Sequence, residues 1–156
     1  MRIIDILTED NITLSLNGKS KNDIITELVE LASHSKNFTD KNKVLTSIFE
    51  REKTMSTGIG HGVAIPHGKS TGVKKICASL GISTNGVDFD SLDGKPVHIF
   101  FLVATPEGPA APHIKFLSRI SRLLNMEDFR KKLISSKSKE EVLRLIEEEE
   151  SKYFEI

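Results

Sequence analysis

The sequence predicts an α/β fold of three layers, with a mixed central β-sheet flanked by helices on both faces. Segments with strand and helix patterns alternate along the chain, and this order is typical of a sheet covered on both sides. A turn-like stretch at residues 84–90 indicates one hairpin, so we expect a mixed rather than a purely parallel sheet. The 156 residues contain no linker long enough to divide them, which favours one domain over residues 1–156.

The first part of the chain indicates one short strand followed by two helices. Residues 12–16 alternate apolar and polar side chains and end at a turn, which predicts a short strand. Ser20 has the features of a helix N-cap, and apolar residues follow it at helical spacing. Thr39 or Asp40 caps a second helix. The C-terminal end of that helix carries Arg51.

The remaining chain alternates between apolar strands and helices. Residues 54–68 are loop-rich, apart from a brief apolar run at 63–65. Residues 75–83 indicate a buried strand, and the turn at 84–90 follows it. The most hydrophobic segment, 97–104, predicts a central strand. Three helices are expected after it: one from about Ala110, one around residues 127–134 and one from Ser138, with Glu141 completing a capping box.

Composition and charge exclude several classes of function. Hydrophobic residues make up 38% and charged residues 28%, as in ordinary soluble proteins. The 22 basic residues equal the 22 acidic ones, so we expect no nucleic-acid partner. The locally basic segment 115–132 has its charges at mixed helical phases, which favours a solvated helix face. Cys77 lies in an apolar run and is expected to be a buried thiol.

No part of the sequence predicts a membrane segment. No window approaches eighteen consecutive apolar residues, and the N-terminus lacks the pattern of a signal peptide. We therefore expect a cytoplasmic protein that does not insert into a membrane.

The segment from Arg51 to Lys69 carries the residues best suited to chemistry. Glycines recur in it at positions 58, 60, 62 and 68, where they permit positive φ and close approach of the backbone to a ligand. Successive amides in such a loop can bind an anion, and a structural bend is the alternative interpretation. The segment lacks the spacing of a nucleotide-binding P-loop. The candidates for lining a phosphoryl pocket are Ser56, Thr57, Gly58, Gly60 and His61.

His67 is the candidate nucleophile. Pro66 precedes it and restricts the backbone that presents it. A neutral imidazole is a good nucleophile near neutral pH, and its attack on a phosphoryl group would give a phosphohistidine. Because a phosphoryl group carries about two negative charges, the site needs cations or hydrogen-bond donors. Arg51 and His113 are the side chains that we expect to supply them.

Residues 57–68, Thr-Gly-Ile-Gly-His-Gly-Val-Ala-Ile-Pro-His-Gly, closely resemble the active-site signature of a known family. This family comprises the fructose/mannitol-type IIA domains of the phosphoenolpyruvate-dependent sugar phosphotransferase system, with their nitrogen-regulatory relatives. The family also has an Arg-Glu pair upstream, as Arg51-Glu52 stands here, and a second histidine that opens a later helix, as His113 does. The resemblance covers essentially the whole chain.

The resemblance implies a phosphocarrier. His67 would accept a phosphoryl group from the phosphorylated histidine-containing protein HPr and pass it to a IIB domain or protein during sugar uptake. His113 would support the phosphoryl group, and Arg51 would neutralise charge during transfer. The mechanism so implied needs no metal, and we expect no cofactor. Possible regulatory protein targets belong to an alternative, in which the chain is a stand-alone nitrogen-type regulator that acts by phosphorylation-dependent protein binding.

A rival enzyme hypothesis uses the same region. His61, His67, His113 and Glu107 could hold a metal in a hydrolase, but their spacing matches no standard ligand motif. The two remaining histidines have structural interpretations. His34 is expected on the surface near the end of the first helix, and His98 is expected to form a structural hydrogen bond at the start of the central strand.

Overall fold

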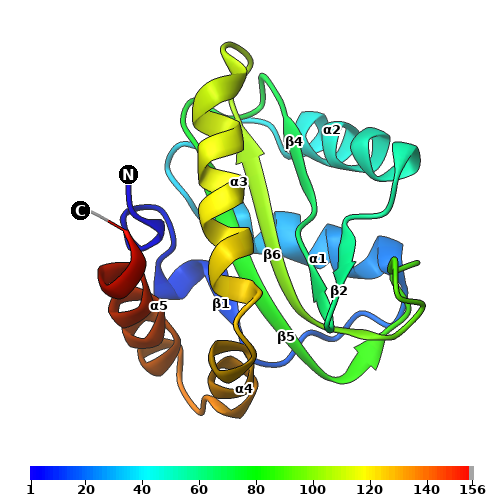
Figure 1. Cartoon of the computed structure of the whole chain (residues 1–156). Coiled ribbons are helices and arrows are strands. Elements are labelled where there is room, and N and C mark those ends of the chain that lie inside the picture. The colour runs from blue at the N-terminus through cyan, green and yellow to red at the C-terminus, as the bar shows by residue number, and fades with distance from the viewer. Residues whose placement is uncertain (155–156) are drawn as a thin grey trace.

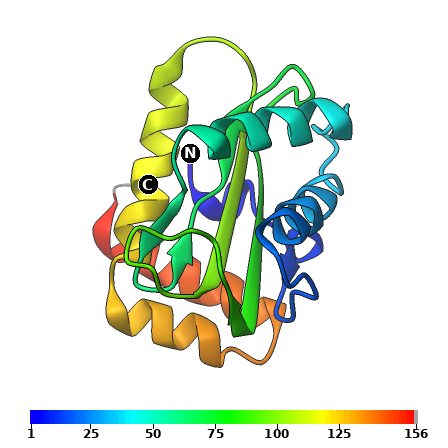
Figure 2. The same ribbon diagram turned by 90° about the vertical axis from the view of Figure 1, so that its right-hand side faces the viewer.

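A computed structural model of the chain describes residues 1–154, and in this range a six-stranded mixed sheet lies between two layers of helices (Figures 1 and 2). The strands are β1 (Ile12–Thr13), β2 (Gly58–Gly60), β3 (Val63–Ala64), β4 (His67–Lys69), β5 (Cys77–Val87) and β6 (Val97–Thr105). The helices are α1 (Lys21–Ala32), α2 (Lys41–Thr54), α3 (Ala110–Leu124), α4 (Glu127–Ser135) and α5 (Lys139–Tyr153). Two short 3-10 helices, η1 (Ile3–Asp5) and η2 (Glu9–Asn11), precede β1.

Strand β6 is the centre of the sheet. Strand β5 pairs with it in antiparallel orientation, while β3 and β4 pair with it in parallel orientation, one after the other along its length. Strand β1 runs parallel to β5, and β2 runs antiparallel to β3, which gives the order β1-β5-β6-β3-β2. The predicted mixed sheet is therefore confirmed.

Both faces of β6 are buried, which explains why the sequence there is continuously apolar. Side chains alternate between the faces of a strand. Phe101 and Val103 join a cluster with α3, α4 and α5, and Phe100 and Leu102 join a cluster with α1 and α2. Figure 2 shows α3 and α1 on opposite sides of the sheet. Each helix layer thus buries its own apolar stripe against one face of the same strands.

The helix starts follow the predicted caps. The Ser20 hydroxyl accepts a hydrogen bond from the amide of Asp23 at 3.1 Å, which caps α1. Of the two residues considered for α2, Asp40 is the cap, and its carboxylate accepts from the amide of Lys43. Ser138 caps α5 in the same way. Each cap satisfies an amide that has no partner within its own helix.

Two local predictions were wrong. Residues 84–87 were expected in a turn, but β5 continues to Val87, with an irregular register after Ile82. Gly86 adopts a φ of +81°, and a Cβ there would lie 2.8 Å from the ring of His98. Glycine therefore lets the strand continue through residues that resemble a turn. Residues 54–68, expected as mostly loop, contain β2, β3 and the start of β4.

Among the helices within residues 1–154, none combines the length and the apolar character that crossing a bilayer requires.

Candidate functional site

His67 lies at the start of β4, and its position follows from the register of the sheet. It pairs with Val103 of β6, so its side chain emerges on the face of the sheet that α3 covers. The next residue, Gly68, faces α2. A Cβ at Gly68 would lie 2.6 Å from the hydroxyl of Ser47 and 3.2 Å from the Ser47 backbone. Glycine at this position therefore allows α2 to pack directly on the strand that carries His67.

The imidazole of His67 is held in one tautomer. Its Nδ1 lies 2.8 Å from the carbonyl oxygen of Ile65, which can only accept, so Nδ1 carries the proton and Nε2 keeps its lone pair. Burial lowers the pKa of His67, and the Arg51 guanidinium lowers it further. The Ile65 carbonyl and the charge of Glu52 oppose this effect. His67 is therefore a neutral imidazole at neutral pH, with a nucleophilic Nε2.

His113 lies in the first turn of α3, directly beside His67. The two ring centroids are 5.5 Å apart, with their planes tilted by 52°. The Nδ1 atom of His113 lies 2.5 Å from the hydroxyl of Thr105, the last residue of β6. Burial, together with the charges of His67 and Lys69, lowers the pKa of His113 to about 4. With Nδ1 accepting from Thr105, the Nε2–H of the neutral ring can donate to an anion.

Arg51 lies in the last turn of α2, where its own helix end holds the guanidinium. Its Nη1 donates to the hydroxyl of Thr54 at 3.2 Å and to the carbonyl of Met55 at 2.8 Å. The charge of Arg51 is close enough to lower the pKa of His67. The structure thus brings three elements together, namely the end of α2, the start of β4 and the start of α3, each with one predicted site residue.

The hydroxyls near the glycine loop are engaged elsewhere. The amide and the hydroxyl of Thr57 both donate to the buried carboxylate of Glu52, at 2.9 and 2.6 Å. The Ser56 hydroxyl donates to the carbonyl of Phe89 at 2.8 Å. A Cβ on Gly58 would lie 2.9 Å from the Cα of Ser91, so that glycine serves close packing. In the structure these three pocket candidates hold the loop in place.

The remaining pocket candidates, Gly60 and His61, lie at the tip of the β2–β3 hairpin, both with positive φ. Next to them, the carbonyl of Gly62 accepts from the amide of His98, near the start of β6. His67 pairs near the other end of that strand. At about 3.3 Å per residue, the two points lie about 16 Å apart along β6. The structure does not bring Gly60 or His61 to His67.

The other two histidines have backbone partners away from His67. The Nδ1 of His98 lies 2.9 Å from the carbonyl of Ser83, which confirms its structural hydrogen bond. His34 is exposed, and its Nδ1 lies 2.9 Å from the carbonyl of Asp10. Within residues 1–154, no group of three or more His, Cys, Asp or Glu side chains is placed to hold a metal ion.

Residues 5–149 match the model of the phosphoenolpyruvate-dependent sugar phosphotransferase system EIIA 2 family. The chain belongs to this family. It is 38% identical over 146 residues to the fructose-specific EIIABC component of Bacillus subtilis, an alignment that covers 94% of this chain and 23% of that protein. It is 37% identical over 148 residues to a nitrogen regulatory protein of Bradyrhizobium diazoefficiens, covering 94% of this chain and 95% of the relative.

A solved structure supports the same assignment. The nitrogen regulatory protein IIA-Ntr of Neisseria meningitidis superposes with a TM-score of 0.85 and 34% identity, covering 92% of this chain and 98% of that one. The α/β fold of this EIIA domain is therefore shared with its relatives along nearly the whole chain.

Three residues around the candidate site were not among its predicted members, although Glu52 was noted beside Arg51. Thr105 orients His113, and Glu52 anchors Thr57. The Nζ of Lys69 donates to the carbonyl of Gly108 at 2.8 Å and so ties β4 to the loop before α3. A usable signal existed for Lys69, because it stands two residues after His67 and strand periodicity places both on one face. Glu52 adjoins Arg51, but its inward direction depends on where α2 ends.

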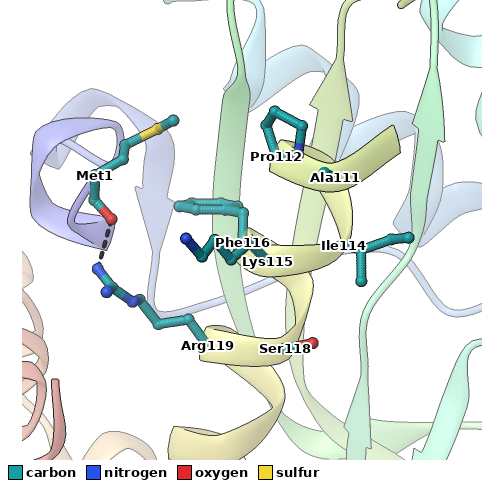
Figure 3. A pocket seen from close by; sticks show the side chains of 8 residues that line it. All are labelled: Met1, Ala111, Pro112, Ile114, Lys115, Phe116, Ser118 and Arg119. Carbon is teal, nitrogen blue, oxygen red and sulfur yellow. Dashed lines mark hydrogen bonds between the residues drawn. The ribbon is translucent and has the colours of Figure 1, made fainter. Parts of the chain in front are cut away.

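An apolar groove of about 700 Å³ runs along the first turns of α3. Figure 3 shows its lining side chains on the first turns of α3, with Met1 facing them from the N-terminal segment. Ile114, which follows His113 directly, is 58% exposed. The groove is lined by Met1, Ala111, Pro112, Ile114, Lys115, Phe116, Ser118 and Arg119. An exposed apolar surface of this kind is suited to contact with another protein.

Proposed function

We propose that this EIIA domain carries a phosphoryl group on Nε2 of His67, taking it from phosphorylated HPr and passing it to a IIB domain. The observation that carries the proposal is the hydrogen bond between His67 Nδ1 and the Ile65 carbonyl, with the ring of His113 5.5 Å from that of His67. This bond leaves Nε2 as the nucleophilic atom. A donor-rich, part-buried surrounding then stabilises the charge of the phosphoryl group.

The transfer consists of two displacements at phosphorus. In the first, the lone pair of His67 Nε2 forms a bond to phosphorus while the bond to the nitrogen of the HPr phosphohistidine breaks, and that nitrogen keeps the electron pair. In the second, a cysteine thiolate of the IIB partner attacks phosphorus, and the electron pair of the breaking bond returns to Nε2. Arg51 and the Nε2–H of His113 balance the charge in both steps.

The known relatives suggest two uses for this chemistry. One relative is named a fructose-specific EIIABC component, of which the chain spans 23%, and another is named a nitrogen regulatory protein. We propose transport of a fructose-like sugar as the main use. Phosphorylation-dependent binding of a regulatory target is the second candidate, and the 37% identity to a nitrogen regulatory protein over 95% of that relative favours it.

The test is incubation with phosphoenolpyruvate, enzyme I and HPr, followed by mass analysis. We expect one acid-labile phosphoryl group, which is absent from His67→Ala. His34→Ala is the matched control, since it removes an exposed histidine and should leave phosphorylation unchanged. Label that persists in His67→Ala would refute the proposal. Delivery of the group to a fructose-type IIB protein would favour transport, and its absence would favour regulation.

A further inference from the structure

A chain of hydrogen bonds leads from the start of α1 to the imidazole of His67. The Nζ of Lys21 lies 2.8 Å from Oε1 of Glu52, whose carboxylate accepts from the amide and hydroxyl of Thr57. The Thr57 carbonyl accepts from the amide of Ile65 at 3.0 Å. The Ile65 carbonyl in turn accepts from Nδ1 of His67 at 2.8 Å. Each group in the chain fixes the position of the next one.

The burial of Glu52 makes its partners necessary. Glu52 is only 6% exposed, and a buried carboxylate is stable only when charges and hydrogen-bond donors surround it. Lys21 is the cation that meets this need, although the first turn of a helix disfavours positive charge. A second ion pair at 3.6 Å to Asp90 and the ring of Phe89 at 4.9 Å hold its ammonium group in place. The pairing with Glu52 therefore accounts for a lysine at this position.

The charge of Glu52 also bears on the reaction. Together with the Ile65 carbonyl it opposes the lowering of the His67 pKa by burial and by Arg51. A phosphoryl group on His67 adds about two negative charges to the same region. A carboxylate without a counter-ion would repel that group, so a paired cation behind Glu52 favours the phosphorylated state.

We propose that Glu52 and Lys21 are a positioning pair for phosphoryl transfer. Glu52 fixes Thr57, which holds Ile65, and the Ile65 carbonyl in turn orients His67 so that Nε2 is free to take the phosphoryl group. Lys21 neutralises Glu52 so that the phosphoryl group is not repelled. This inference rests on the proposed function of His67. Both residues act through other groups. The titratable groups that act directly on His67 and its partner ring are Arg51 and Glu52 from α2, Lys69 on β4 and His113 from α3.

The test compares Lys21→Met, Glu52→Gln and the double variant. Lys19→Met is the matched control, because Lys19 is exposed and stands only two residues before Lys21. Three quantities are measured for each: the single-turnover rate of phosphoryl uptake from phosphorylated HPr, the pKa of His67 by NMR titration, and the melting temperature. A structural role alone would move only the melting temperature.

Lys21→Met should raise the pKa of His67 and slow uptake by about tenfold, the value of one hydrogen bond to a charged group. Glu52→Gln should lower that pKa, with a smaller loss of rate, because the amide oxygen still accepts from Thr57. The double variant should recover the rate of Glu52→Gln. The inference is overturned if folded Lys21→Met keeps the wild-type rate and pKa, or if the double variant stays as slow as Lys21→Met.

The design separates this inference from the function on which it rests. If wild-type protein is not phosphorylated on His67, the proposed function itself fails. If it is phosphorylated and the variants match it, only the positioning pair fails. Lys21→Met leaves the buried charge of Glu52 unpaired and could unfold for that reason. The double variant removes both charges, so it is then used for the test instead. An unchanged pKa of His67 in the folded double variant and in Glu52→Gln would then overturn the inference.

Discussion

Phosphorylation of His67 should change the protonation state of His113. In the unphosphorylated protein the His113 ring is neutral, because burial and nearby positive charge lower its pKa to about 4. The ring centroids of the two histidines are 5.5 Å apart. Two negative charges at this distance, with an effective dielectric constant of about 20, attract a proton on His113 by about 6 kcal/mol. This energy corresponds to a rise of about 4 in the pKa.

Phosphorylation of His67 therefore also adds a proton to His113. With its pKa raised to this extent, His113 becomes a cation at neutral pH and donates a charged hydrogen bond to phosphoryl oxygen. When the group leaves for the acceptor, the pKa falls again and the proton is released. His113 would thus stabilise the phosphorylated state without repelling Lys69 in the free state.

NMR titration of the ring Hε1 signals, with and without phosphorylation, measures this coupling. His34 provides the control signal, since its ring lies at the Asp10 carbonyl, away from the site. We expect the midpoint of the His113 curve to move from about 4 to above neutral pH on phosphorylation. A midpoint that stays near its unphosphorylated value, in protein shown by mass to carry the phosphoryl group, would refute this electrostatic argument.

Three further predictions concern stability. Gly68→Ala should destabilise the fold by about 1–3 kcal/mol, measured by urea unfolding, because the new Cβ meets Ser47 at 2.6 Å. Glu150→Ala should cost about 3 kcal/mol, since the buried carboxylate accepts from the amide of Ile3, and Glu150→Gln should cost less. The pKa of His113 is about 4 in the folded protein and 6.5 in the unfolded chain, so the unfolded chain is protonated first as the pH falls. The folded state therefore loses stability as the pH falls from 6.5 to about 4. On acidification, the free energy of unfolding of His113→Asn should therefore fall by about 2 kcal/mol less than that of the wild type. Equal losses in the two proteins would contradict the assignment.

The elements that the sequence predicted well are those whose pattern is local. Caps such as Ser20 and Asp40 act within three residues, and the apolar spacing of α3 repeats over several turns. The strands around His67 were not predicted from the local pattern. Strands β3 and β4 have two and three residues, and their partners lie in β6, more than thirty positions away. No local periodicity can reveal so short a strand, because long-range pairing decides it.

The candidate site shows the same division. His67, His113 and Arg51 were predicted from residue chemistry and from a resemblance, and the fold brings their elements together. His61 was considered because it is close to His67 in sequence, but a hairpin carries it toward the other end of β6. The role of Thr105 depends on the meeting of a strand end and a helix start. Only the tertiary structure shows such a contact.

The nitrogen that carries phosphorus is the most direct test of the account. Protein labelled with ¹⁵N is phosphorylated through enzyme I and HPr, and long-range proton–nitrogen NMR identifies the modified atom. The account predicts phosphorus on Nε2 of His67, with Nδ1 still protonated and bonded to the Ile65 carbonyl. Phosphorus on Nδ1, or on any other side chain, would contradict it.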